Sequence, residues 1–156
     1  MKASTEIVVQ DGMKHRLGED FYYKIHFSYG TEYEYHHPTG YYSMVQHKHE
    51  WWIRARKGCC WDGATKYPDY QWMLYPSLIH DILHWMIKRG VIEERYNFLI
   101  DRELEYMVRT SKTPIPWWQG GNKTRPIRAY IIRRATNTSD EKRSDAKDFK
   151  EIRIPI

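Results

Sequence analysis

The first sixty residues carry short runs rich in apolar β-branched or aromatic side chains, separated by polar turn residues such as Asp11-Gly12 and Tyr29-Gly30. β-branched and aromatic residues favour strands, because their side chains pack well on a pleated surface. Adjacent runs joined by short turns favour antiparallel pairing, as a meander or as hairpins. The pattern predicts strands at Glu6–Val9, Phe21–Tyr29, Tyr41–Gln46 and Glu50–Ala55, with Tyr33–Tyr35 as an extension.

Two later segments carry apolar residues at helical spacing, and both have end signals. Ser77 is a candidate N-cap and Gly90 a helix stop, which predicts a helix over Leu78–Arg89. A second helix is predicted over Glu93–Arg109, because the acidic residues Glu93 and Glu94 are favoured at the positive N-terminal end of a helix. The short connection between these helices requires that they pack antiparallel. The segment from Trp61 to Tyr75 has no steady period and predicts a loop.

A third, short helix is predicted over Pro126–Arg134, with its apolar residues on one face and Arg128 and Arg133 pointing away. The chain of 156 residues suits one α+β domain over 1–136, followed by a charged C-terminal tail over 137–156. The end of the tail, Ile152–Ile156, alternates apolar and polar residues as an added edge strand would. We therefore expect the tail to dock on protein partners.

The composition narrows the functional classes. The 13 Tyr and 7 Trp residues predict a core built on aromatic side chains. No run approaches the roughly 20 apolar residues that cross a bilayer, so no transmembrane segment is expected. The two cysteines, Cys59 and Cys60, are adjacent, which favours a reduced cytosolic site of synthesis. The net charge of +5 permits nucleic-acid binding, and one segment combines tryptophans with basic side chains. For this segment we favour basic residues on a solvated helix face and tryptophans in the core: Trp117, Trp118, Lys123, Arg125, Arg128, Arg133 and Arg134.

One polar line runs along the otherwise apolar first helix, and it contains His80, Asp81 and His84. Residues at equal distances from the turn face each other in an antiparallel pair, because each helix rises by the same amount per residue. Asp81 lies ten residues before Val91 and Asp101 ten residues after it. The spacing predicts that His80, Asp81 and Asp101 converge, with a His80 ring nitrogen in hydrogen-bond reach of Asp101.

Three interpretations of this cluster remain open. It can be a structural network in which His80 donates to Asp101. It can activate a water, with His80 as general base, one aspartate fixing its tautomer and a free carboxylate or a metal stabilising charge. It can hold zinc through His80 and His84, since two histidines four residues apart on a helix can share one metal.

The residues also carry a family resemblance. The segment Trp61-Asp62-Gly63-Ala64-Thr65, the run from Pro76 to His84, and Asp101 resemble a bacterial and phage family, domain of unknown function 1353. The resemblance spans roughly Phe21 to Arg109, and it makes Asp62 and Gly63 motif positions beside the His-Asp helix. The chain departs from the family pattern at His84, where Tyr is usual, and at Ile100, where Ala is usual. The resemblance implies a phage-encoded protein made in the host cytoplasm. Together with a C-terminal tail that is expected to dock on partners, it favours a virion-associated tail, neck or host-entry component.

The His-Asp helix is also similar to the core of phospholipases A2. That resemblance implies an alternative function, calcium-dependent hydrolysis of phospholipid or another cell-envelope ester. His80 would then be the general base, Asp81 a calcium ligand and Asp101 the residue that orients the histidine. The calcium loop of those enzymes is absent from this chain, so Lys57-Gly58 to Gly63 would have to replace it.

Overall fold

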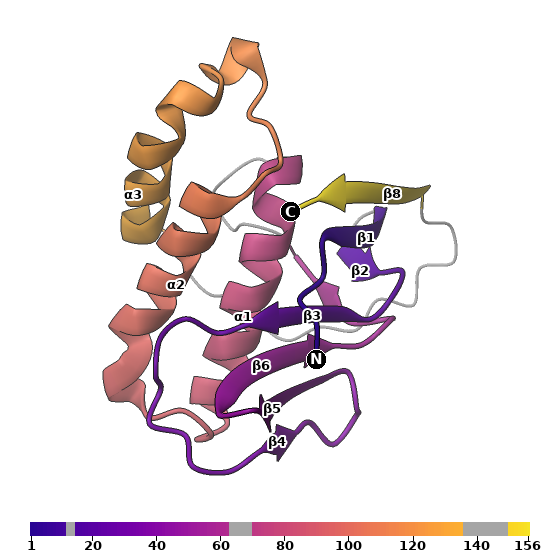
Figure 1. Ribbon diagram of the computed structural model, residues 1–156, viewed down its shortest axis with the longest axis vertical. Coiled ribbons are helices and arrows are strands. Elements are labelled where there is room, and N and C mark those ends of the chain that lie inside the picture. Colours follow the sequence, from indigo (N-terminus) through magenta and orange to yellow (C-terminus); the bar gives the residue numbers. More distant parts are fainter. Residues whose placement is uncertain (12–14, 63–69, 136–149) are drawn as a thin grey trace.

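The computed structural model describes residues 1–11, 15–62, 70–135 and 150–156. It is an α+β structure with two four-stranded antiparallel sheets and three α-helices, as the pattern predicts. Helix α1 lies centrally, with the strands on one side and α2 and then α3 on the other (Figure 1). The α-helices are α1 (Leu74–Lys88), α2 (Asn97–Thr110) and α3 (Arg125–Ala135), with the 3-10 turns η1 (Gln71–Met73), η2 (Glu94–Tyr96), η3 (Trp117–Gln119) and η4 (Asn122–Thr124).

The second sheet contains most of the predicted strands, in the order β3-β6-β5-β4. Strands β5 and β6 form a hairpin whose turn places Lys48 and His49 at positive φ. The predicted strand over 21–29 ends early, at Lys24, because the backbone N–H groups of His26 and Phe27 donate to a side chain of α2, Glu103. The strands of this sheet are β3 (Phe21–Lys24), β4 (Tyr35–His36), β5 (Tyr42–His47) and β6 (Glu50–Ala55).

The first sheet, in the order β7-β2-β1-β8, joins the two ends of the chain. Its last strand pairs antiparallel with β1 over six residues, from Glu6 opposite Pro155 to Asp11 opposite Lys150. The C-terminal residues therefore form an edge strand, as their alternation predicts, but on the chain's own sheet and not on a partner. The strands are β1 (Glu6–Asp11), β2 (His15–Leu17), β7 (Cys60–Trp61) and β8 (Lys150–Pro155), and the rest of the predicted tail, 137–149, lies outside the described residues.

Two helix predictions need correction. Helix α1 begins at Leu74 and not after Ser77, and Pro76 lies in its first turn, where a missing N–H costs no hydrogen bond. Ser77 lies inside the helix, donates to the Leu74 carbonyl and accepts a hydrogen bond from Trp61 Nε1. Helix α3 forms as predicted, but it buries Ala129 and Ile132 and leaves exposed the apolar face that was expected to pack inward: Ile127, Tyr130 and Ile131.

The core lies where α1 meets the sheets and α2. Nearly all of α1 is buried, including Trp85, whose ring packs against that of Tyr42 on β5 at a centroid distance of 5.7 Å. Aromatic side chains dominate the largest buried volumes, as the composition predicts: Trp61, Trp72, Trp85, Tyr42 and Phe21. No described helix is long and apolar enough to cross a membrane. The core therefore holds α1 rigidly against α2, which fixes the polar residues where these helices meet.

Candidate metal centre between the first two helices

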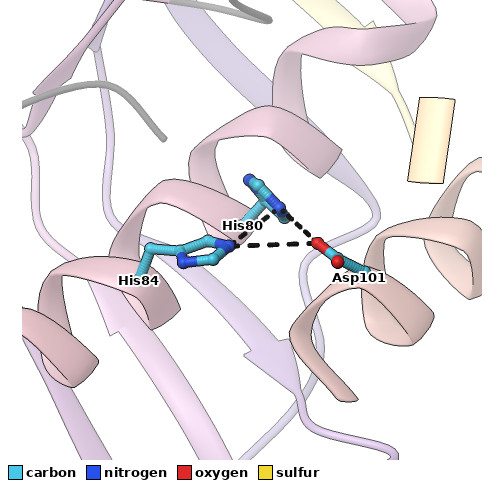
Figure 2. Close-up of side chains that lie close together, drawn as sticks. All are labelled: His80, His84 and Asp101. Carbon is cyan, nitrogen blue, oxygen red and sulfur yellow. Dashed lines mark hydrogen bonds and ion pairs between the residues drawn. The ribbon is translucent and has the colours of Figure 1, made fainter. Parts of the chain in front are cut away.

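Three polar side chains converge between α1 and α2. His80 and His84 lie one helical turn apart on α1, so both rings project from the same face. Asp101 lies on the first half of α2, on the side that faces α1. Figure 2 shows the two imidazole rings and the carboxylate pointing toward one another. The convergence of His80 with Asp101, predicted from equal spacing about Val91, is confirmed.

The separations among the three side chains are short. His80 Nε2 lies 3.2 Å from Asp101 Oδ1 and 3.1 Å from His84 Nε2. His84 Nε2 lies 4.0 Å from the same Asp101 oxygen. The His80 ring is buried, whereas Asp101 keeps 29% of its side-chain surface exposed. One edge of the cluster is therefore open to solvent.

Asp81 lies on the other side of the His80 ring. Its side chain is buried, and its Oδ1 lies 3.8 Å from His80 Nδ1. Asp101 therefore faces the Nε2 side of His80, which it shares with His84, while Asp81 faces Nδ1. This geometry favours the reverse of the roles that the phospholipase resemblance implies, with Asp101 among the ligand atoms and Asp81 orienting the histidine.

The two histidines have pKa values shifted in opposite directions. Burial acts to lower the pKa of His80, but the carboxylates of Asp101 and Asp81 outweigh it and raise that pKa. Burial and then the neighbouring His80 lower the pKa of His84 to about 4, although Asp101 opposes the shift. At neutral pH the His84 ring is therefore uncharged, and one of its nitrogens carries a lone pair.

The three atoms lie at distances suited to a common metal ion. A triangle with sides of 3.1, 3.2 and 4.0 Å has a circumradius of about 2.0 Å, the length of Zn–N and Zn–O bonds. Calcium takes six to eight oxygen ligands at about 2.3–2.6 Å, so a site with two imidazoles does not suit it. Asp81 would then be the outer carboxylate that orients a metal-bound histidine.

The other predicted site positions are not part of this cluster. Within the ranges that the structure describes, His80, His84 and Asp101 are the one group of three or more His, Cys, Asp or Glu side chains placed to share a metal. Asp62 is half-buried directly after β7 and contributes no atom to it. Gly63, the neighbouring motif position, lies outside the described residues. Cys59 and Cys60 are both buried and contribute no atom to the cluster.

A second polar cluster, which the sequence pattern did not predict, lies around Glu103. This carboxylate is fully buried and accepts hydrogen bonds from Tyr23 Oη at 2.5 Å and from the backbone of His26 and Phe27 at 3.1 Å. The His26 Nδ1 atom lies 3.0 Å from Glu103. A signal was present in the sequence, because Glu103 lies at helical spacing between Ile100 and Met107 on the apolar face of α2.

Comparison of the chain with protein-family models, with curated proteins and with solved structures gives no match. The resemblance to domain of unknown function 1353 therefore stays a prediction. The fold and the site define an α+β protein with a candidate two-histidine, one-aspartate metal centre.

Proposed function

We propose that this protein is a metal-dependent hydrolase that holds a zinc-like divalent ion between His80, His84 and Asp101. The observation that carries the proposal is the triangle formed by the two Nε2 atoms and Asp101 Oδ1, with sides of 3.1, 3.2 and 4.0 Å. Three protein ligands are the number found in catalytic zinc sites, which leave a further position for water. The exposed edge at Asp101 gives water and substrate a route to that position.

The reaction class follows from this ligand set. A zinc ion lowers the pKa of its bound water to about 7, which supplies a hydroxide nucleophile at neutral pH, and it polarises the bond under attack. The second oxygen of Asp101 would be left to accept a hydrogen bond from such a water, because only Oδ1 belongs to the triangle. Asp81, behind His80, would hold that ring in the tautomer that leaves Nε2 free. We propose an ester as substrate, as in the alternative that the phospholipase resemblance implies, with zinc in place of calcium.

The test begins with metal binding to the full chain after removal of metals by a chelator. Calorimetric titration should give one zinc per chain and no calcium binding. Asp101→Asn keeps the side-chain shape, and His84→Ala removes a half-buried ring. Loss of a residue that only orients a metal ligand weakens metal binding by roughly 10–100-fold, and each of these two changes should weaken zinc binding by more than that. Asp81→Asn should fall within that range. The exposed His36 supplies the control, because His36→Ala should leave zinc binding unchanged.

The second step measures turnover of chromogenic carboxylic and phosphate esters by the zinc-loaded protein. We expect hydrolysis that Asp101→Asn abolishes and that His36→Ala preserves. Stoichiometric zinc without hydrolysis would reduce the site to a structural metal centre and end the hydrolase proposal. Absence of zinc binding would remove the metal centre as well.

The role in a phage particle stays a prediction from the family resemblance. The expectation of a C-terminal strand that pairs with a partner's sheet contributed to this prediction. Residues 150–155 instead pair with β1 of the same chain. Fractionation of particles from a producing host, with detection of this chain in the virion, tests that role directly.

A further inference from the structure

Most of the large exposed apolar side chains described in the helical half lie on α3 and on the 3-10 turn η3. Trp117 is 87% exposed and Trp118 is 65% exposed, where the sequence predicted core tryptophans. We call the set Trp117, Trp118, Ile127, Tyr130 and Ile131 the α3 face. Exposed tryptophan and isoleucine side chains grouped in this way are typical of a surface that binds something.

The α3 face has a fixed shape. Arg128 on α3 donates from Nε to Thr124 Oγ1 at 2.9 Å and from Nη2 to the backbone carbonyl of Gln119 in η3. The Gln119 side chain is in turn held by the buried Trp72, whose Nε1 donates to Gln119 Oε1 at 3.0 Å. The turn that carries the two exposed tryptophans is therefore tied to the helix that carries the exposed isoleucines.

A hollow of about 320 Å³ lies along the same helix. Its walls are mostly aliphatic, with one guanidinium at the edge: Thr124, Ile127, Arg128, Ile131 and Ile132. An apolar depression beside a cationic side chain suits a molecule that has a hydrocarbon part and an anionic part.

The stretch of chain that carries this face is basic. The stretch 111–135 contains six Lys or Arg residues and no Asp or Glu. Arg125 is bound to backbone carbonyls, and Arg133 pairs with Glu105. Lys123, in the turn directly before α3, is exposed. The face therefore combines aromatic, aliphatic and cationic side chains.

We propose that the α3 face binds the surface of an anionic lipid membrane. Tryptophan favours the boundary between lipid headgroups and hydrocarbon, and aliphatic side chains on a basic amphipathic helix enter the same layer. Lysine and arginine at this depth contact anionic headgroups. This proposal is independent of the metal centre, which lies between α1 and α2.

The observations favour a membrane over two other occupants. Single-stranded nucleic acid would stack on the tryptophans, but it gives no role to the exposed isoleucines. A symmetric contact with a second copy would bring two surfaces of the same positive charge together, which costs binding free energy. A lipid surface satisfies the apolar and the cationic side chains together.

The test is cosedimentation of the full chain with vesicles of phosphatidylcholine mixed with phosphatidylglycerol, and with vesicles of phosphatidylcholine alone. We expect binding to the anionic vesicles that weakens as salt is raised. The double variant Trp117→Ala with Trp118→Ala, and separately Ile127→Asp, should each weaken this binding at least about tenfold. Tyr33→Ala is the matched control, because Tyr33 is 79% exposed but lies outside the α3 face.

Circular dichroism melting of each variant confirms that it is folded before binding is compared. Absence of binding to anionic vesicles overturns the proposal, and so does binding that survives the changes at the α3 face. Binding of an oligonucleotide, or self-association, that the tryptophan changes abolish while vesicle binding is absent would assign the face to nucleic acid or to a second copy.

Discussion

Glu103 offers a stability test of the packing that positions the candidate site. Its carboxylate has no exposed surface and lies two residues after Asp101 on α2. It accepts hydrogen bonds from Tyr23 and Tyr29 and from the backbone N–H groups of His26 and Phe27. Glu103→Ala removes the acceptor of all these donors and leaves them facing a cavity.

The size of the effect follows from these contacts. Each buried donor left without a partner costs about 1–3 kcal/mol. Because the losses of neighbouring contacts are not additive, we expect Glu103→Ala to cost about 3–5 kcal/mol in total. At roughly 2–4 °C per kcal/mol for a chain of this size, we expect Glu103→Ala to lower the melting temperature by about 6–20 °C. Glu103→Gln keeps one acceptor oxygen but turns an NH2 group toward donors, so its loss should be intermediate.

Urea unfolding followed by circular dichroism measures the free energy of unfolding of both variants. Arg102→Ala, an exposed position on the same helix, is the control and should stay within about 0.5 kcal/mol of the parent chain. If Glu103→Ala lowers the free energy of unfolding by less than about 1 kcal/mol, the reasoning is refuted, because several buried donors that lose their acceptor should cost more than that.

Two further predictions follow from contacts between elements. Burial acts to raise the pKa of Glu105, but Arg133 and Arg109 outweigh it and lower that pKa below its ordinary value of 4.5. Glu105→Gln should therefore destabilise the fold at neutral pH. The difference in stability should vanish as acid titrates the carboxylate of the parent chain, which melting curves measured across pH would show. Removal of 150–156 deletes the strand paired with β1 and the buried Ile154, so it should cost about 3 kcal/mol, measurable by urea unfolding; an unchanged midpoint would mean that this strand contributes nothing to the domain.

Local pattern determined much of this protein. Runs of aromatic and β-branched residues marked β5 and β6 nearly to the residue, and the turn between these strands is short. Gly90 marked the turn between the predicted helices, and a common helical rise then placed Asp101 opposite His80. These features depend on residues near one another in the sequence or on one fixed repeat, so they can be derived without the fold.

The remaining features required tertiary contacts. Whether Ile152–Ile156 joins its own sheet or another depends on an unpaired edge at β1, which no local pattern reveals. Whether the apolar side of α3 faces inward depends on which face α2 leaves free; here it buries Ala129 and Ile132 and exposes Ile127 and Ile131. Which of Asp81 and Asp101 faces Nε2 of His80 was likewise decided by the side on which α2 packs, since that packing brings the Asp101 carboxylate to the Nε2 atoms of both histidines.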